Sequence, residues 1–144
     1  MPGLQSKILA MLKKIVIFIL ILSTSIPASV AQSQQDLNKK INASLSSADT
    51  KELSKYFASF VNLTLPGKEG LFSKTQTETL LRQFFEANKP LTFTVDRQGQ
   101  SKEKSSYCVA RFSSSSKKFS IYYLVREMDN QMQIVQLQIE ETQN

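Results

Sequence analysis

Apolar and polar residues alternate through the second half of the chain, in short segments separated by polar or turn-forming residues. Alternation of this kind is typical of strands with one face against a core and the other in water. The segments are residues 91–96, 107–112, 119–126 and 132–140. Polar runs at 99–106 and 113–116 predict loops, and Asp129 with Asn130 predicts a tight turn. Because short connections join antiparallel neighbours, the second half predicts an antiparallel meander.

The first half of the chain has a helical period instead. Apolar residues recur every three or four positions in the segments 34–45, 50–58 and 74–87. Asp49 followed by Glu52, and Ser73 followed by Gln76, have the spacing of capping boxes at the starts of the second and third segments. These patterns predict three helices, of which the third has the clearest apolar face.

Two short strands are predicted between the second and third helices. Residues 61–65 alternate, residues 66–67 are a Pro-Gly turn, and residues 68–72 can pair back. The predicted order is therefore helix, helix, strand pair, long helix and meander. This is an α+β fold in which the long helix turns Phe84 and Phe85 toward the sheet.

Residues 1–31 contain three lysines and no acidic residue, and the unbroken apolar run 15–22 follows the last two lysines. Ser29 and Ala31 are the small residues at positions −3 and −1 of a cleavage point after Ala31. A basic flank, a short apolar segment and small residues are typical of a secretory signal. We therefore predict a cleaved signal peptide at 1–31 and a single soluble domain at 32–144, located in the periplasm or outside the cell.

Two alternatives at the N-terminus stay open. The first is an uncleaved anchor, although the apolar run is shorter than the roughly 20 residues that a membrane-spanning helix needs. The second concerns the start, because Met11 opens a signal of normal shape by itself. Either Met1 or Met11 can therefore be the first residue.

The absence of histidine narrows the chemistry open to this chain. It excludes Ser–His and Cys–His nucleophile pairs, His-ligated zinc and haem with a proximal His. The single cysteine, Cys108, allows no intrachain disulfide. The chain after the signal has 15 basic and 12 acidic residues, a net charge of +3 with scattered bases, so we predict no nucleic-acid binding. No metal-binding or cofactor motif occurs, and we predict neither a metal nor a cofactor.

Five segments carry a family resemblance. They are residues 72–78, 84–85, 93–95, 98–99 and 134–140. In these segments the chain resembles a family of secreted bacterial proteins of unknown function within the nuclear-transport-factor-2-like superfamily, and the resemblance covers nearly all of 36–141. It implies a cone-shaped fold, in which N-terminal helices and one long helix pack on a curved antiparallel sheet. Arg97 stands where this family often has His, and Ala110 where Gly is usual, and both departures count against a common active site at the Gln98-Gly99 segment.

The resemblance also implies where a ligand could lie, since cone folds hold ligands in the mouth between sheet and helices. The ligand-pocket candidates are Tyr56, Phe60, Phe84, Tyr107, Arg111 and Tyr122. Enzymes of this superfamily use Asp, Tyr or His in the hollow, where an apolar surround raises the pKa of a carboxyl until it is a usable base. Asp96, opposite Phe93 and Val95 on its strand, is the candidate here.

These observations favour an exported, non-catalytic domain that binds a small amphipathic ligand or an envelope protein in or beside the cone. One alternative is a small isomerase- or dehydratase-like enzyme that uses Asp96 and a tyrosine. Another is a purely structural envelope partner with a filled cone. The segment 119–126 is apolar on both faces, with Tyr122 and Leu124 on the second face, which must therefore meet a curled sheet edge or a second subunit. Of these two we predict the second, a homodimer through the outer face of the sheet.

Overall fold

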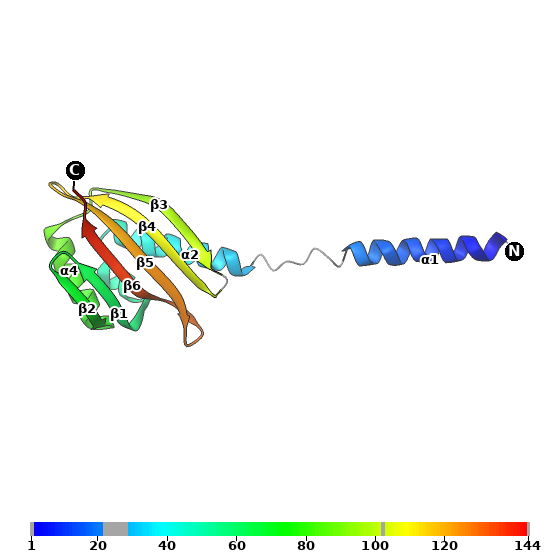
Figure 1. The fold of residues 1–144 in the computed structure, drawn as a ribbon, viewed down its shortest axis with the longest axis horizontal. Coiled ribbons are helices and arrows are strands. Elements are labelled where there is room, and N and C mark those ends of the chain that lie inside the picture. The colour runs from blue at the N-terminus through cyan, green and yellow to red at the C-terminus, as the bar shows by residue number, and fades with distance from the viewer. Residues whose placement is uncertain (1, 22–28, 102, 144) are drawn as a thin grey trace. The chain divides into compact units, whose positions relative to one another are not determined.

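The computed structural model describes residues 2–21, 29–101 and 103–143 (Figure 1). It divides into two compact units, residues 1–33 and 34–144. The first unit contains helix α1, Pro2–Ile21. Neither α1 nor any other helix in the described ranges combines the length and the hydropathy that a membrane span needs. Residues 22–28 of the predicted signal lie outside the described residues, and cleavage after Ala31 stays a prediction.

The elements after α1 are helices on one face of a six-stranded sheet (Figure 1). The helices are α2, Ser29–Ser46, α3, Thr50–Ser54, and α4, Lys74–Ala87. The strands are β1, Phe57–Leu65, β2, Lys68–Ser73, β3, Thr92–Ser101, β4, Ser105–Ser113, β5, Lys118–Met128, and β6, Gln131–Glu141. Their order in the sheet is β2-β1-β6-β5-β4-β3, which confirms the predicted α+β class and the meander β3 to β6.

The sheet is curved and almost entirely antiparallel. Of the strand pairs in the described part of the chain, only β1 and β6 run parallel. The pairing register shifts within the β1–β6, β3–β4 and β5–β6 pairs. Because a bulge bends its strand and increases the local twist, these shifts let the sheet wrap around the helices.

The long helix begins and ends where the sequence predicts. At its start the Ser73 hydroxyl accepts a bond from the Gln76 N–H at 3.2 Å, and the Gln76 side chain accepts one from the Ser73 N–H at 3.1 Å. Near its end, Phe85 is buried and the Phe84 ring meets Phe119 of β5 edge-on at 5.3 Å. The predicted contact of this helix with the sheet is thus confirmed.

The helix predicted at 50–58 is too long. α3 ends at Ser54, and Phe57 opens strand β1 instead. The carbonyl of Tyr56 accepts a bond from the N–H of Ile134 at 2.7 Å, and Phe57 pairs with Ile134 in β6. An aromatic-rich segment fits either period. Here the strand is favoured, because it forms backbone hydrogen bonds to β6 and buries Phe57, which is 1% exposed.

The loop predicted at 99–106 is also wrong. β3 continues to Ser101 and β4 begins at Ser105, so residues 99–101 and 105–106 of the predicted loop belong to strands. β3 is an edge strand, and most of its side chains are exposed, so polar residues cost nothing there. The predicted turn at Asp129 and Asn130 is confirmed, and both residues have positive φ, 52° and 61°, as a tight hairpin turn requires.

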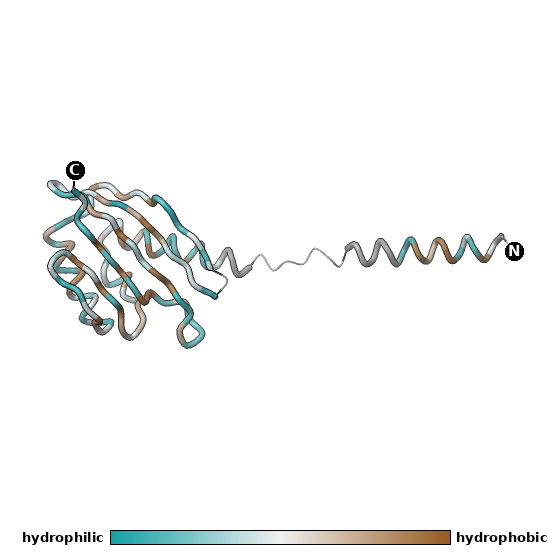
Figure 2. The backbone as a smooth tube through the Cα atoms, viewed as in Figure 1, coloured by the Kyte–Doolittle hydropathy of each residue, from teal (hydrophilic) through white to brown (hydrophobic). Residues whose placement is uncertain are grey.

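The strands of the meander alternate between two faces. Apolar and polar colours follow each other along β4, β5 and β6 (Figure 2). The inner face, toward the helices, carries fully or almost fully buried side chains, namely Cys108, Ala110, Phe112, Phe119, Ile121, Tyr123, Val125, Leu137 and Ile139. The outer face carries half-buried or exposed side chains.

Candidate functional site

The inner side of the sheet is occupied by the protein's own side chains. Tyr123 is 0% exposed, and its hydroxyl donates to Asn42 Oδ1 at 3.1 Å and lies 3.5 Å from the carbonyl oxygen of Asn38. The thiol of Cys108 lies 3.7 Å from the same Asn42 oxygen. Burial raises the pKa of both Tyr123 and Cys108 above their ordinary values. These contacts fix α2 against the middle of the sheet.

The described buried polar side chains on this side are all hydrogen-bonded within the protein. Within the described residues, every buried side-chain nitrogen or oxygen has a hydrogen-bond partner. Nor do three or more Cys, Asp or Glu residues gather there as a metal ion would require. The buried apolar side chains of β4, β5 and β6 on this side belong to the hydrophobic core cluster.

The outer face of the meander carries a group of apolar side chains. The rings of Tyr107 on β4 and Tyr122 on β5 stack, with 6.5 Å between centroids and 26° between planes. Val109 lies opposite Tyr122, and Leu124 lies opposite Tyr107. All four side chains are half-buried, and the helices α2, α3 and α4 lie on the other face of the sheet (Figure 1). Such cross-strand pairs stabilise the sheet, and they also form a flat apolar surface.

Gly99 on β3 is what allows the Tyr107 ring to lie flat. A Cβ atom at position 99 would come within 2.6 Å of the Tyr107 ring. Gly99 pairs with Tyr107 across the two strands, so the ring covers the bare backbone of the edge strand. The Gln98-Gly99 segment that carries the family resemblance thus has a packing role here.

Asp96 and Arg111 form an exposed ion pair beside these tyrosines. Nε and one terminal nitrogen of Arg111 donate to the two Asp96 oxygens at 2.6 and 2.7 Å. The hydrogen bond from Arg111 holds the pKa of the Asp96 carboxyl below its usual value. A base in an apolar hollow needs the opposite shift, so this position does not suit the role proposed for Asp96 in catalysis. Arg111 also lines a hollow of about 250 Å³ with Thr94 and Lys118.

A second hollow lies on the β1–β2 side of the outer face. Phe60, Leu71 and Met128, which are 61%, 69% and 44% exposed, line a cavity of about 360 Å³ together with Arg126 and Asp129. Ala58, Ser59, Gln133 and Val135 complete the lining. Large apolar side chains are rarely left this exposed in a group, and such groups mark binding surfaces.

The hollow and the tyrosines belong to one continuous face. The pairing registers connect them in a row across the sheet, which runs Leu71, Asn62, Gln136, Leu124 and Tyr107. None of these five side chains is charged. We call the residues Phe60, Leu71, Met128, Leu124, Tyr107 and Tyr122 the outer-face surface.

Four of the six predicted pocket residues lie on this face of the sheet. They are Phe60, Tyr107, Arg111 and Tyr122, carried by β1, β4 and β5. Phe84 does not join them, because its ring packs among Phe85, Phe112 and Phe119 in the core.

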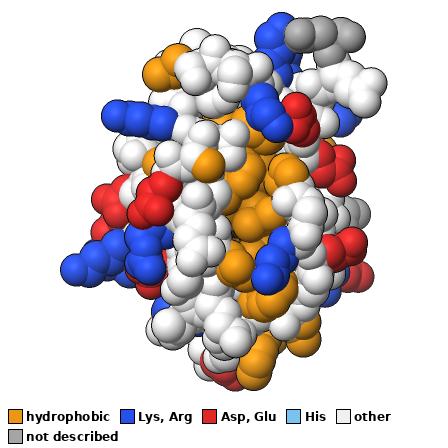
Figure 3. Space-filling view, turned by 90° about the vertical axis from the view of Figure 1, so that its left-hand side faces the viewer, with side chains coloured by type: hydrophobic (Ala, Val, Ile, Leu, Met, Phe, Trp, Pro, Cys, Tyr) orange, Lys and Arg blue, Asp and Glu red, His pale blue; other side chains and the backbone are white. Residues whose placement is uncertain are grey.

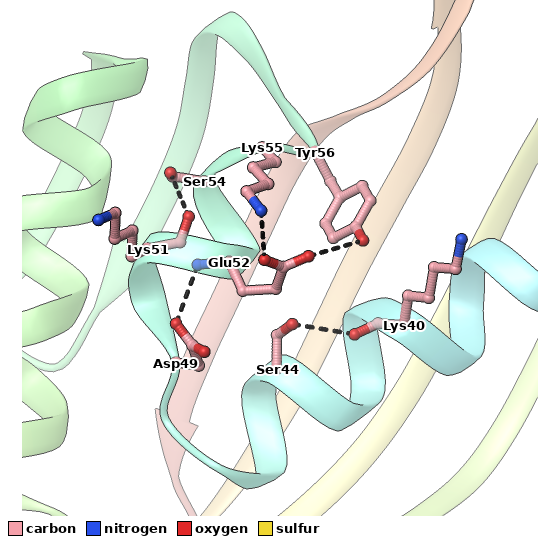
Figure 4. Close-up of polar contacts among 8 residues, drawn as sticks. All are labelled: Lys40, Ser44, Asp49, Lys51, Glu52, Ser54, Lys55 and Tyr56. Carbon is pink, nitrogen blue, oxygen red and sulfur yellow. Dashed lines mark hydrogen bonds and ion pairs between the residues drawn. The ribbon is translucent and has the colours of Figure 1, made fainter.

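Tyr56 also lies elsewhere, just after α3 (Figure 4). Its hydroxyl donates to Glu52 Oε1 at 3.3 Å, and Glu52 Oε2 pairs with Lys55 at 2.6 Å. Hydrogen bonding to Lys55 lowers the pKa of Glu52, whereas burial raises the pKa of Tyr56. Asp49 accepts the Glu52 N–H at 2.9 Å, as the predicted N-cap requires. This cluster holds the short helix together.

Sequence reasoning missed Leu71, Met128 and Arg126. Leu71 and Phe72 are adjacent apolar residues in a short strand, which means that one of them must point away from the core. That signal was present in the sequence. The approach of Met128 and Arg126 to Leu71 depends on pairings between distant strands, and no local pattern indicates it.

Comparison with known families gives one match over most of the chain. A family described as a domain of unknown function, DUF4783, matches residues 38–140. No curated protein matches the chain.

Solved structures agree with this match. A DUF4783 family protein from Bacteroides ovatus is 26% identical, with a TM-score of 0.68 over 73% of this chain and 94% of that one. A second, from Bacteroides uniformis, is 23% identical, with a TM-score of 0.69 over 74% and 97%. An NTF2-like protein of unknown function from Shewanella baltica is 10% identical, with a TM-score of 0.58 over 81% and 98%. The last likeness supports the fold, a nuclear-transport-factor-2-like cone, as the sequence predicts.

Proposed function

We propose that this chain, which belongs to the DUF4783 family of domains of unknown function, is a non-catalytic binding domain. Its outer-face surface binds another protein. The proposal includes export, because residues 1–31 have the pattern of a secretory signal. The partner is then a protein of the cell envelope or its surroundings.

The observation that carries this proposal is the hollow at Phe60, Leu71 and Met128, on the same face as the stacked tyrosines. Protein interfaces combine aromatic residues, methionine and arginine at their centre with few other charges. A preformed pocket that accepts one apolar side chain is the usual place for an energetic hot spot. The hollow offers such a pocket, and Tyr107 and Tyr122 offer the flat surface beside it.

The filled inner side supports the same proposal from the other direction. Asn42, Tyr123 and Cys108 meet in the middle of the cone, where the Tyr123 hydroxyl and the Cys108 thiol both donate to the Asn42 side-chain oxygen. A ligand there would have to displace α2. Binding beside the cone requires no such rearrangement.

A second copy of the chain is the competing occupant of this surface, and one observation favours it. The paired residues Glu69, Thr64, Gln138, Tyr122, Val109 and Arg97 form a row across the outer face, with opposite charges at its two ends. In a two-fold dimer with sheets face to face and the axis along the strands, Glu69 of each copy would lie over Arg97 of the other. The predicted homodimer therefore remains a proposal.

A small amphipathic ligand is the third occupant to consider. The volume of the hollow, about 360 Å³, lies within the range of small-molecule sites. Its lining combines apolar side chains with Arg126, whose guanidinium could pair with a carboxylate.

Site-specific photo-crosslinking tests the proposal and separates the three occupants. A photoreactive amino acid replaces Tyr122 in the full chain expressed in a bacterial envelope, and the control carries it at Gln35, an exposed position on α2. We expect Tyr122 to give a crosslink to a different protein, and we expect Leu71→Asp in the same chain to abolish it. A crosslink of the chain to itself would favour the homodimer. A small-mass adduct would favour the amphipathic ligand, and no adduct at all from Tyr122 would refute the proposal.

A further inference from the structure

Strand β2 has one edge that no other strand in the described ranges covers. It is the first strand in the sheet order, and among these strands it pairs only with β1. The N–H of Ser73 donates to the Gln76 side chain rather than to β1. Because residues two apart on a strand direct their backbone groups to the same side, the N–H and C=O groups of Glu69 and Leu71 face this free edge. Unpaired backbone groups in a row are a template for an added strand.

A groove runs between this edge and α4. Its cavity measures about 290 Å³. Phe72 of β2 and Leu80 of α4 form its apolar part, and Lys68, Thr75, Gln76 and Thr79 supply polar groups. Figure 3, which views the end of the molecule where α4 and β2 lie in Figure 1, shows a band of apolar side chains bordered by polar and charged ones.

This groove is separate from the outer-face surface. Phe72 pairs with the buried Val61 and therefore points to the helix side of the sheet. Leu71, the preceding residue, points to the outer face. Gly70 leaves room for the Phe72 ring, because a Cβ atom at position 70 would lie only 3.3 Å from that ring.

The groove carries a positive charge. Lys68 is the one charged residue among those that line it, and none of them is acidic. Lys68 is exposed and forms no ion pair with any residue in the described ranges. An acidic group on a ligand would therefore find an unneutralised cation at the start of β2.

We propose that the groove binds an extended peptide segment, which adds to the free edge of β2 as an antiparallel strand. One apolar side chain of the peptide lies over Phe72 and Leu80, and an acidic residue near its C-terminal end lies beside Lys68. Backbone bonds to Glu69 and Leu71 supply affinity, and the two side-chain contacts supply specificity. β2 has six residues, so the bound segment spans about 20 Å.

The test uses the blocked seven-residue peptide Val-Thr-Val-Thr-Val-Thr-Asp, in which the valines and the aspartate lie on one face of the extended strand. Titration of the full chain is followed by the amide resonances of β2 and by hydrogen exchange. We expect the resonances of Lys68–Ser73 to shift and exchange at the Glu69 and Leu71 amides to slow, since those two N–H groups face the edge. A peptide that ends in lysine should bind about fivefold more weakly.

Two variants keep the proposal falsifiable. With Lys68→Glu the preference for the two peptides should reverse, which a merely structural role of Lys68 would not produce. Leu80→Asp should abolish binding, whereas the control Met128→Asp, which changes an exposed apolar residue of β5 outside the groove, should leave it intact. Because Met128→Asp damages the outer-face surface, the control also keeps this inference distinguishable from the proposed function. The inference is overturned if the aspartate peptide leaves the β2 amides unchanged at millimolar concentration, or if Lys68→Glu leaves the peptide preference as it was.

Discussion

Tyr122 and Tyr123 are neighbours on β5 that point to opposite faces, and removing each hydroxyl separately tests the closed inner side. Tyr123→Phe removes a fully buried hydroxyl and leaves the Asn42 oxygen with only the weak thiol of Cys108 at 3.7 Å. A lost hydrogen bond and an underused buried acceptor together cost about 1.5 kcal/mol of unfolding free energy. The Tyr122 hydroxyl has no hydrogen-bond partner among the described residues. Tyr122→Phe should therefore change the unfolding free energy by less than about 0.5 kcal/mol.

Urea unfolding followed by circular dichroism measures both variants. With a slope of about 1–2 kcal/mol per M of urea, Tyr123→Phe should lower the midpoint by about 1 M, and Tyr122→Phe should leave it nearly unchanged. Equal midpoints for Tyr123→Phe and the unaltered protein would refute the reasoning, because they would mean that water already reaches the Tyr123 hydroxyl. A larger loss for Tyr122→Phe would refute the assignment of the two faces.

The same residue predicts how stability responds to alkaline pH. Burial raises the pKa of Tyr123 above its ordinary value of 10.0. Below pH 10 the phenol is neutral in both states, so its contribution to stability is fully present. Above pH 10 the unfolded state loses the proton first, and the unfolding free energy should fall by up to about 1.4 kcal/mol per pH unit from this group. That part of the slope should be missing in Tyr123→Phe.

Three further predictions concern other parts of the fold. Arg111→Gln should raise the Asp96 carboxyl titration midpoint in NMR from below toward its ordinary value of 3.8, and an unchanged midpoint would show that the ion pair does not form in solution. Gly99→Ala should push the Tyr107 ring aside and so change the near-ultraviolet circular dichroism. Because the ring can move, the unfolding free energy should fall by less than about 1.5 kcal/mol. An unaltered spectrum would contradict the 2.6 Å contact. Phe84→Ala should cost about 3 kcal/mol in urea unfolding, and a loss under 1 kcal/mol would mean that its ring does not pack in the core.

The elements that sequence predicted best are those whose signals are local. α4 has a capping box at its start and an apolar stripe along one side, and both act within a few residues of each other. The strands of the meander alternate regularly because one face is buried. The helix predicted around Phe57 was wrong, because the helical spacing of this segment competes with strand pairing to β6, which lies far away in sequence.

The candidate surface depends even more on distant pairings. Tyr107 and Tyr122 could be placed on one face by alternation alone, and the register of β4 with β5 then brings them together. The hollow needs the order of the whole sheet, because Leu71 and Met128 come from β2 and β5. The Asn42 contact with Tyr123 had a sequence signal, a polar residue beside the apolar Ile41 on α2, but its partner could not be known without the packing of α2 on the sheet.

The central claim is that the inner side of the cone is closed, so that recognition takes place outside it. Cys108, the chain's single cysteine, lies on that inner side and is 0% exposed. Its rate of reaction with a small thiol reagent in the native protein, divided by the rate in urea, measures the closure directly. The account predicts native protection of at least about a thousandfold, since only opening of the core exposes the thiol. Reaction at nearly the unfolded rate would show that small molecules enter the cone, and it would contradict the account.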